Sequence, residues 1–203
     1  MRPKTAAIVV LLSISLAQSE EDPILKQKFE EHGLVPDVIG KAPGRLVKVY
    51  YGENGTLQPG EVLPQDQIQG EPEKVSWEAD PDELYTLIMT DIDAPSKENR
   101  SDGDEKRWLV VNIPGYGLAE GEVRSPYEPP QPAAGTGLHR FIFLVYKQSQ
   151  TLNSTDEDPE PETTTGESET STPWTINDFA RVNELGDPIA GNFFRVEGMA
   201  TEE

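Results

Sequence analysis

Hydrophobic positions occur along the chain in short runs, a pattern typical of β-strands rather than long helices. In LVKVYY, Val47, Val49 and Tyr51 fall on one face of an extended segment, because side chains alternate along a strand. The runs LYTLIMT, WLVVNI and FIFLVY are apolar at nearly every position, as expected of strands buried on both faces. Predicted strands cover residues 46–51, 74–79, 84–91, 108–113, 139–147 and a last one within 187–198. The pattern predicts an all-β core with at least one buried sheet.

One helix is predicted, in TINDFARVNEL from residue 175. Thr175 is the N-cap and Asp178 stands three residues later, as in a capping box. Ile176 and Phe179 follow with helical spacing, and Gly186 ends the helix. No long helix is expected before residue 174.

The first residues, MRPKTAAIVVLLSISLAQSEE, have the features of a secretory signal peptide. Arg2 and Lys4 precede an apolar run, and the small residues Ser15 and Ala17 allow cleavage after residue 17. The alternative is a membrane anchor, but the run is shorter than the ~20 residues that span a bilayer. We therefore expect residues 1–17 to be removed and the protein to be secreted and extracellular, without a stable membrane anchor.

Three glycosylation sequons agree with export, at Asn54, Asn99 and Asn153, each in a polar, turn-rich stretch. Cysteine is absent, so no disulfide stabilises the fold and no thiolate can bind a metal. Stability must come from the size of the core.

The formal net charge is −20, which excludes nucleic acid as a partner because such binding needs Lys and Arg to neutralise phosphates. The length predicts a single domain, over residues 24–198. Within it, residues 151–173 are acidic, rich in Ser and Thr and without aromatic residues, and are predicted to be a disordered insertion. The charged stretch 96–107 is interpreted as solvated surface.

Candidate chemistry begins at TDIDAPS, where Asp91 and Asp93 stand two residues apart and would share one face of a strand. Paired carboxylates can act as acid and base if their surroundings separate their pKa values. The alternative is a strand end closed by an Asp turn before Pro95. His139, at the start of a hydrophobic strand, would alone bond a neighbouring backbone group; beside Asp91 and an arginine it could bind an anion.

Four blocks carry a family resemblance: TDIDAPS, RWLVVNIPG, GTGLHRFIFLVY and GDPIAGNFF. Their order and spacing are similar to the phosphatidylethanolamine-binding protein family, which includes Raf kinase inhibitor proteins and secreted animal members. The resemblance covers roughly residues 24–198. It implies a large central antiparallel sheet flanked by a smaller sheet and by peripheral short helices. It also implies a small surface pocket for a phosphate-like anion.

The resemblance places several pocket residues on this sequence. Asp91 and Asp93 match the two aspartates of the family's DPDAP motif, and His139 matches the histidine of its GLHR block. Phe141 stands where the family has a tyrosine, so the ring is kept and the hydroxyl is lost. The family's second pocket histidine falls on Arg107, whose guanidinium could hold a phosphate through two donors.

The resemblance also marks losses around this pocket. The glycine-rich wall reads YEPPQPAAGTG, in which Pro132 is kept and Ala133 replaces the next proline. The family's C-terminal helix, which adds an aromatic wall, has no counterpart before residue 203. The pocket is therefore expected to be degenerate, with ligand-binding candidates Asp91, Asp93, Arg107, Pro132, His139 and Phe141.

Two functions from different classes follow. The first is a secreted binding protein for a phosphate-like anion or phospholipid head group. The alternative is a protease or signalling modulator that acts by surface contact, as some members of the resembled family do. An enzyme is not expected, because the sequence has no G-x-S-x-G motif, no cysteine and no metal-ligand spacing around the Asp pair. No cofactor and no metal are expected.

Overall fold

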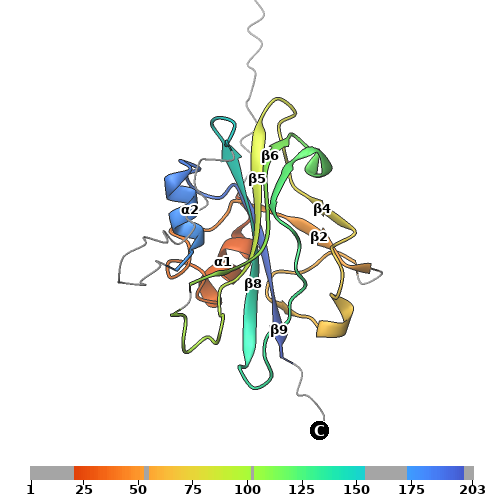
Figure 1. The fold of residues 1–203 in the computed structure, drawn as a ribbon, viewed down its shortest axis with the longest axis vertical. Coiled ribbons are helices and arrows are strands. Elements are labelled where there is room, and N and C mark those ends of the chain that lie inside the picture. The colour runs from red at the N-terminus through yellow and green to blue at the C-terminus, as the bar shows by residue number, and fades with distance from the viewer. Residues whose placement is uncertain (1–20, 53–54, 102, 154–172, 199–203) are drawn as a thin grey trace, which may run out of the picture.

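The computed structural model describes residues 21–52, 55–101, 103–153 and 173–198. Figure 1 shows a central sheet along the length of the molecule, with helices α1 and α2 on one side and strands β2 and β4 on the other. Neither α-helix in these ranges is long and apolar enough to cross a bilayer. The predicted signal peptide 1–17, Asn54 and residues 154–172 of the predicted insertion lie outside the described residues.

The central sheet has seven strands. Its order is β1 (Arg45–Leu46), β9 (Ala190–Glu197), β8 (Leu138–Gln148), β5 (Leu84–Asp91), β6 (Glu105–Pro114) and β7 (Glu122–Ser125), and β3 (Glu61–Val62) also pairs with β9. The pairs from β9 to β7 are antiparallel, whereas β1 and β3 join β9 in parallel. The prediction of a β-dominated fold is therefore confirmed, but the sheet is mixed at one edge rather than wholly antiparallel.

A second sheet contains β2 (Lys48–Tyr50) and β4 (Lys74–Ser76), paired antiparallel. The first predicted strand, 46–51, is divided between β1 in the central sheet and β2 in the small one. The next, 74–79, ends earlier than predicted, at Ser76. The flanking small sheet implied by the family resemblance is thus present.

Both faces of the central sheet are buried, as the apolar runs predict. Along β8, Phe141, Phe143 and Val145 pack towards the small sheet, on what we call the small-sheet face, with Val49 of β2 and Val75 of β4. The residues between them, Ile142, Leu144 and Tyr146, pack towards the helices, on the helix face. Alternation along one strand therefore divides the core into two layers.

Helix α1 (Pro23–Glu31) is an element that the hydrophobic pattern missed. It begins at Asp22, whose carboxylate accepts hydrogen bonds from the N–H groups of Ile24 and Leu25 at 2.9 and 3.1 Å. The helix buries Leu25 and Phe29 against the sheet. Two buried residues in nine give a weak periodic signal, but the Asp-Pro start is a recognisable N-terminal signal.

Helix α2 (Ile176–Val182) confirms the prediction made from its sequence. The Thr175 hydroxyl accepts a hydrogen bond from the Asp178 N–H at 3.1 Å, as an N-cap does. The helix ends at Asn183, earlier than predicted, and Gly186 follows with a φ of +70°.

Two segments assigned to the surface contribute to the interior. In stretch 96–107, Asp104 is buried and accepts hydrogen bonds from the Ile176 N–H at 2.9 Å and from Arg100 at 3.3 Å. The interpretation of that stretch as solvated surface is wrong there, because this carboxylate joins β6 to the start of α2. Leu152, inside the predicted insertion, is 3% exposed and packs in the helix-face core.

The anchoring of Leu152 can be tested by truncation. The Asn112 side chain makes two hydrogen bonds with the Leu152 backbone. Its oxygen accepts from the Leu152 N–H and its amide N–H donates to the Leu152 carbonyl, each at 2.8 Å. We expect Leu152→Ala to lower the free energy of unfolding by about 2–5 kcal/mol, through lost burial and the remaining cavity. Leu138→Ala, at a half-exposed leucine, should cost less than about 1 kcal/mol. Urea unfolding of both variants measures this, and equal costs would show that Leu152 is not anchored.

Candidate functional site

The carboxylates of the two aspartates in the Asp-x-Asp pair lie on opposite faces of the central sheet. Asp91, the last residue of β5, bonds His139, whereas Asp93 bonds Arg140. The Asp93 N–H donates to the Asp91 carboxylate at 2.9 Å. This is the Asp turn that the sequence left as an alternative, and it sends the two carboxylates in different directions. Asp93 therefore does not belong to the same site as Asp91.

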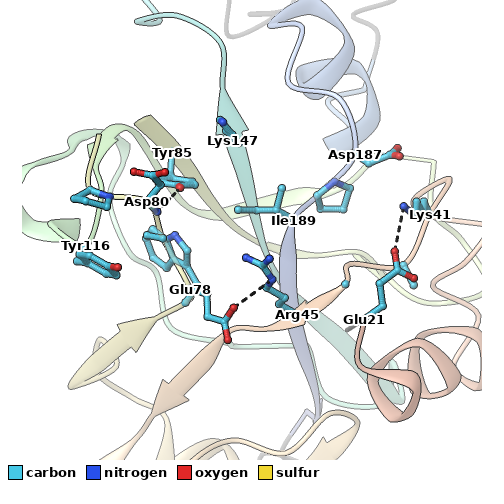
Figure 2. A pocket seen from close by; sticks show the side chains of 16 residues that line it. Glu21, Lys41, Arg45, Glu78, Asp80, Tyr85, Tyr116, Lys147, Asp187 and Ile189 are labelled. Carbon is cyan, nitrogen blue, oxygen red and sulfur yellow. Dashed lines mark hydrogen bonds and ion pairs between the residues drawn. The ribbon is translucent and has the colours of Figure 1, made fainter. Parts of the chain in front are cut away.

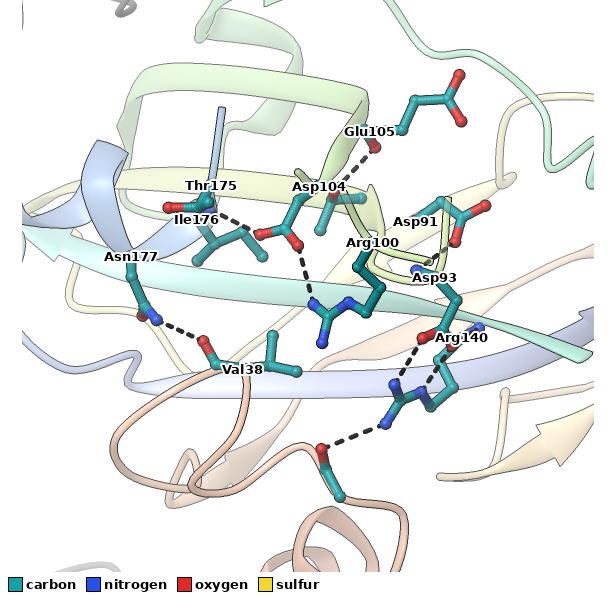
Figure 3. A network of polar contacts seen from close by, with 12 residues as sticks. Val38, Asp91, Asp93, Arg100, Asp104, Glu105, Arg140, Thr175, Ile176 and Asn177 are labelled. Carbon is teal, nitrogen blue, oxygen red and sulfur yellow. Dashed lines mark hydrogen bonds and ion pairs between the residues drawn. The ribbon is translucent and has the colours of Figure 1, made fainter. Parts of the chain in front are cut away.

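Asp93 and Arg140 form a buried ion pair. The Arg140 Nη2 and Nε donate to the two Asp93 carboxylate oxygens at 2.6 and 2.7 Å, and the Arg140 backbone N–H donates at 3.0 Å. Arg140 Nη1 reaches the His32 carbonyl at the end of α1, at 2.7 Å. Figure 3 shows the Asp93–Arg140 pair beside the Arg100–Asp104 pair. The cluster joins β5, β8 and α1.

His139 is held at both ring nitrogens and is 2% exposed. Its Nδ1 lies 2.8 Å from the Asp91 carboxylate, and its Nε2 lies 2.8 Å from the Thr136 hydroxyl. The same hydroxyl lies 2.7 Å from the Ala133 carbonyl, to which it can donate. His139 is thus oriented by Asp91 and covered by Thr136.

Burial raises the pKa of Asp91 above its usual range. The hydrogen bonds from His139 and from the Asp93 N–H lower it, and the Arg107 charge lowers it further, but burial is the larger effect. The Asp91 carboxylate therefore interacts with both His139 and Arg107, on the small-sheet face.

Arg107 is 9% exposed and lies between two carboxylates. Its Nη2 donates to Glu105 at 2.6 Å, and its Nη1 lies 3.6 Å from Glu128. Its Nε is buried and has no hydrogen-bond acceptor among the residues that the structure describes. Glu105 stands two positions before Arg107 on the same strand, a spacing from which their ion pair could have been predicted. No feature of the sequence indicates that Glu128 lies near Arg107.

The remaining predicted residues form the surroundings of the site. Phe141 is fully buried and stacks on Phe194, with ring centroids 5.4 Å apart, so it supports the site from beneath. Pro132 is buried against the end of β9, where its carbonyl oxygen lies 2.6 Å from the place a Cβ on Gly198 would occupy. Both residues therefore lie in the structure around the site rather than at an open surface.

Two tyrosines near Arg107 were missed by sequence reasoning. The Tyr127 and Tyr51 hydroxyls lie 3.0 Å apart, and the Tyr127 ring packs edge-on against Trp108. Burial raises the pKa of Tyr127 to about 12 even though the Arg107 charge lowers it. A neutral phenol with this placement adds an aromatic wall and a possible donor beside the guanidinium.

A hollow of about 950 Å³ lies at the other end of the sheet. It is lined by Tyr85 of β5, roughly 20 Å along the strand from Asp91. Figure 2 shows that its cations face acids: Arg45 pairs with Glu78 and Lys41 with Glu21, at 3.3 and 3.5 Å. It is separate from the predicted site. The described residues contain no cluster of three His, Asp or Glu side chains that could hold a metal.

Comparison with known proteins identifies relatives of this chain. A family model described as phosphatidylethanolamine-binding protein matches residues 53–194. A 26 kDa secreted antigen of Toxocara canis is 39% identical over 82% of this chain, and the match spans 62% of that protein's length. The putative odorant-binding protein A5 of Drosophila melanogaster is 30% identical, over 90% of this chain and 85% of that protein.

Solved structures share the fold. A carboxypeptidase Y inhibitor, crystallised with its cognate proteinase, superposes with a TM-score of 0.70 at 23% identity, covering 87% of this chain and 96% of that one. The phosphatidylethanolamine-binding protein of Plasmodium vivax gives a TM-score of 0.67 at 18% identity, covering 85% and 97%. At these identities the comparison concerns the fold alone.

The Asp93–Arg140 pair should be costly to break from one side. Arg140→Met leaves the Asp93 carboxylate buried without its partner, and we expect the free energy of unfolding to fall by about 3–5 kcal/mol. The double variant Asp93→Asn/Arg140→Met removes the uncompensated charge and should recover part of that loss. Arg181→Met, at an exposed pair with Asp178, should cost less than about 1 kcal/mol. Chemical denaturation of the three variants checks the order; a double variant no more stable than Arg140→Met would contradict it.

Proposed function

The chain belongs to the phosphatidylethanolamine-binding protein family, and from this premise we propose that it is a secreted binding protein for a zwitterionic, phosphate-bearing head group. The observation that carries the proposal is the setting of Arg107. A buried guanidinium with an unused Nε lies beside the Asp91–His139 pair and between Glu105 and Glu128.

This charge arrangement favours a zwitterion over a simple anion. A guanidinium can hold a phosphate through two donors. Glu105 and Glu128 would repel a free phosphate, but they would attract an ammonium group on the same ligand. A phosphate oxygen that displaced the Thr136 hydroxyl would also meet the His139 Nε2. Phosphoethanolamine combines these two charges in one small molecule.

The names of two relatives support secretion and binding. One is called a secreted antigen and the other a putative odorant-binding protein. The alternative, a protease or signalling modulator that acts by surface contact, is supported by fold likeness to a carboxypeptidase inhibitor. The two functions differ in one respect: head-group binding requires Arg107, and surface inhibition does not.

Ligand charge provides the test of binding. By titration calorimetry at pH 7.5, we expect phosphoethanolamine to bind more tightly than inorganic phosphate. Arg107→Gln should weaken phosphoethanolamine binding by about tenfold or more, because a charge-assisted hydrogen bond is lost. Glu128→Gln should weaken phosphoethanolamine but strengthen inorganic phosphate, since it removes an attraction for ammonium and a repulsion of phosphate. Arg181→Gln, on the surface of α2, is the control.

Three results would decide against head-group binding. They are absence of heat with either ligand, equal affinities for both, or an Arg107→Gln variant that binds like the wild type. If the same variants inhibited a serine carboxypeptidase as well as the wild type does, the surface-contact function would take its place.

Secretion can be tested through Asn99. This asparagine is exposed, and its side-chain oxygen accepts a hydrogen bond from the Ser101 N–H at 3.3 Å, which forms a turn across the sequon. Expressed in a secretory cell, the protein should appear in the medium beginning near Gln18 and carry an N-glycan at Asn99. Asn99→Gln should lower the mass by one glycan, as intact-protein mass spectrometry would show. Retention in the cytosol with Met1 intact would contradict the prediction.

A further inference from the structure

A second polar hollow, of about 600 Å³, lies on the helix face at the same end of the central sheet as the site above. Its walls come from the end of α1, the loop after β5, the turn before β8, and β9. We call it the helix-face hollow. It is lined by the basic residues His32, Lys97, Arg100, Arg140 and Arg195 and by the acidic residues Glu31, Asp37 and Glu98, with Thr136, Gly137 and Leu138 at the turn.

Basic and acidic residues lie at different depths in the helix-face hollow. The three arginines are buried or half-buried, and His32 is half-buried. The three carboxylates are exposed to solvent, and Glu31 is already paired with Lys28 on α1 at 3.2 Å. Exposed carboxylates are screened by water, whereas the deeper guanidinium groups are not. Two deeper carboxylates, Asp93 and Asp104, are paired with Arg140 and Arg100. The half-buried Arg195 therefore gives the floor of the hollow an excess of positive charge, in a chain whose net charge is −20.

Several donors at the helix-face hollow have no acceptor among the described residues. The Arg195 Nε donates to the Gly60 carbonyl at 3.0 Å, and no carboxylate of these residues lies within ion-pair distance of Arg195 or Lys97. The Arg100 Nε is buried and has no acceptor in the same part of the chain, while its Nη2 donates to Asp104. Buried donors without partners are costly, so they favour an external acceptor.

His32 stands in the middle of this positive region, with its ring against Phe193 at a centroid distance of 5.1 Å. Burial lowers the pKa of His32, and the charges of Arg195 and Lys28 lower it further; Glu31 opposes them, and Arg140 adds the smallest lowering effect. Like charges gathered around one imidazole repel one another, and a bound anion would relieve that repulsion.

We propose that the helix-face hollow binds the tetrahedral oxyanion of a small organic sulfate or phosphate ester. Arg195, Arg100 and Lys97 supply the charge, and His32 supplies a ring nitrogen. Guanidinium groups match such oxyanions through parallel donors. The hollow is much larger than a free sulfate ion, and its volume falls within the usual range for small-molecule sites, so the ligand includes an organic group.

This site is distinct from the proposed head-group site and does not depend on it. Arg140 and Arg195 lie on the helix face, whereas His139 lies on the small-sheet face, because side chains alternate along β8 and β9. The two sites meet at Thr136, which lines the helix-face hollow and bonds His139.

The chain has two histidines, one at each site, and this allows both to be followed in one experiment. Imidazole NMR signals of the full chain would be recorded over a pH series, with and without inorganic sulfate or 4-nitrophenyl sulfate. We expect both probes to shift His32 saturably and to raise its titration midpoint by roughly one pH unit, because an anion stabilises the imidazolium. The ester should bind several-fold more tightly than inorganic sulfate.

Variants separate the two sites. Arg195→Gln and Lys97→Gln should each weaken the His32 response at least several-fold; Lys97 is exposed, so its variant does not disturb folding. Arg181→Gln should behave like the wild type, and Arg107→Gln should leave the His32 response intact. An unchanged response in both Arg195→Gln and Lys97→Gln, a response confined to His139, or loss of the His32 response in Arg107→Gln would overturn the proposal. Equal affinities of the two probes would overturn its assignment to an ester.

Discussion

The buried pair of Asp93 and Arg140 is the interaction on which the arrangement of both polar sites depends. It fixes the bend after β5 against β8, and through the His32 carbonyl it fixes the end of α1. A buried ion pair adds little net stability compared with apolar packing, but it tolerates few geometries, because a misplaced partner leaves a charge without compensation. The pair therefore determines where the neighbouring residues of the same two strands, Asp91 and His139, can lie.

Alternation along the two strands then gives the sheet two chemically different faces at one end. On the small-sheet face, Asp91 and His139 share a hydrogen bond beside Arg107, whose charge is largely matched by Glu105 and Glu128. On the helix face, the buried and half-buried arginines outnumber the buried carboxylates. The same pleat that separates the two hydrophobic cores thus separates the two sets of charges.

Arg107 stands where the family resemblance places a second pocket histidine, and an arginine there would change what the proposed site can bind. A guanidinium keeps its charge at any physiological pH, and it recruits carboxylates that would not surround a neutral imidazole. The site consequently combines opposite charges at close range, with Tyr127 and Trp108 as an aromatic wall. Such a setting is suited to a ligand that is itself zwitterionic.

The sequence by itself determined the long central strands and the blocks that carry the family, because hydrophobic runs such as LYTLIMT can be buried only between two layers. The family resemblance of these blocks also suggested that Asp91, His139 and Arg107 belong to one site. The sequence did not reveal the short edge strands β3 and β7. It did not determine that Asp93 turns to the opposite face, that Leu152 packs, or that β1 and β3 add in parallel to β9. Two of those features depend on partners that are distant in the sequence, Arg140 for Asp93 and Asn112 for Leu152. Only the tertiary structure decides which charges meet, because a side chain's partner is set by distance in space.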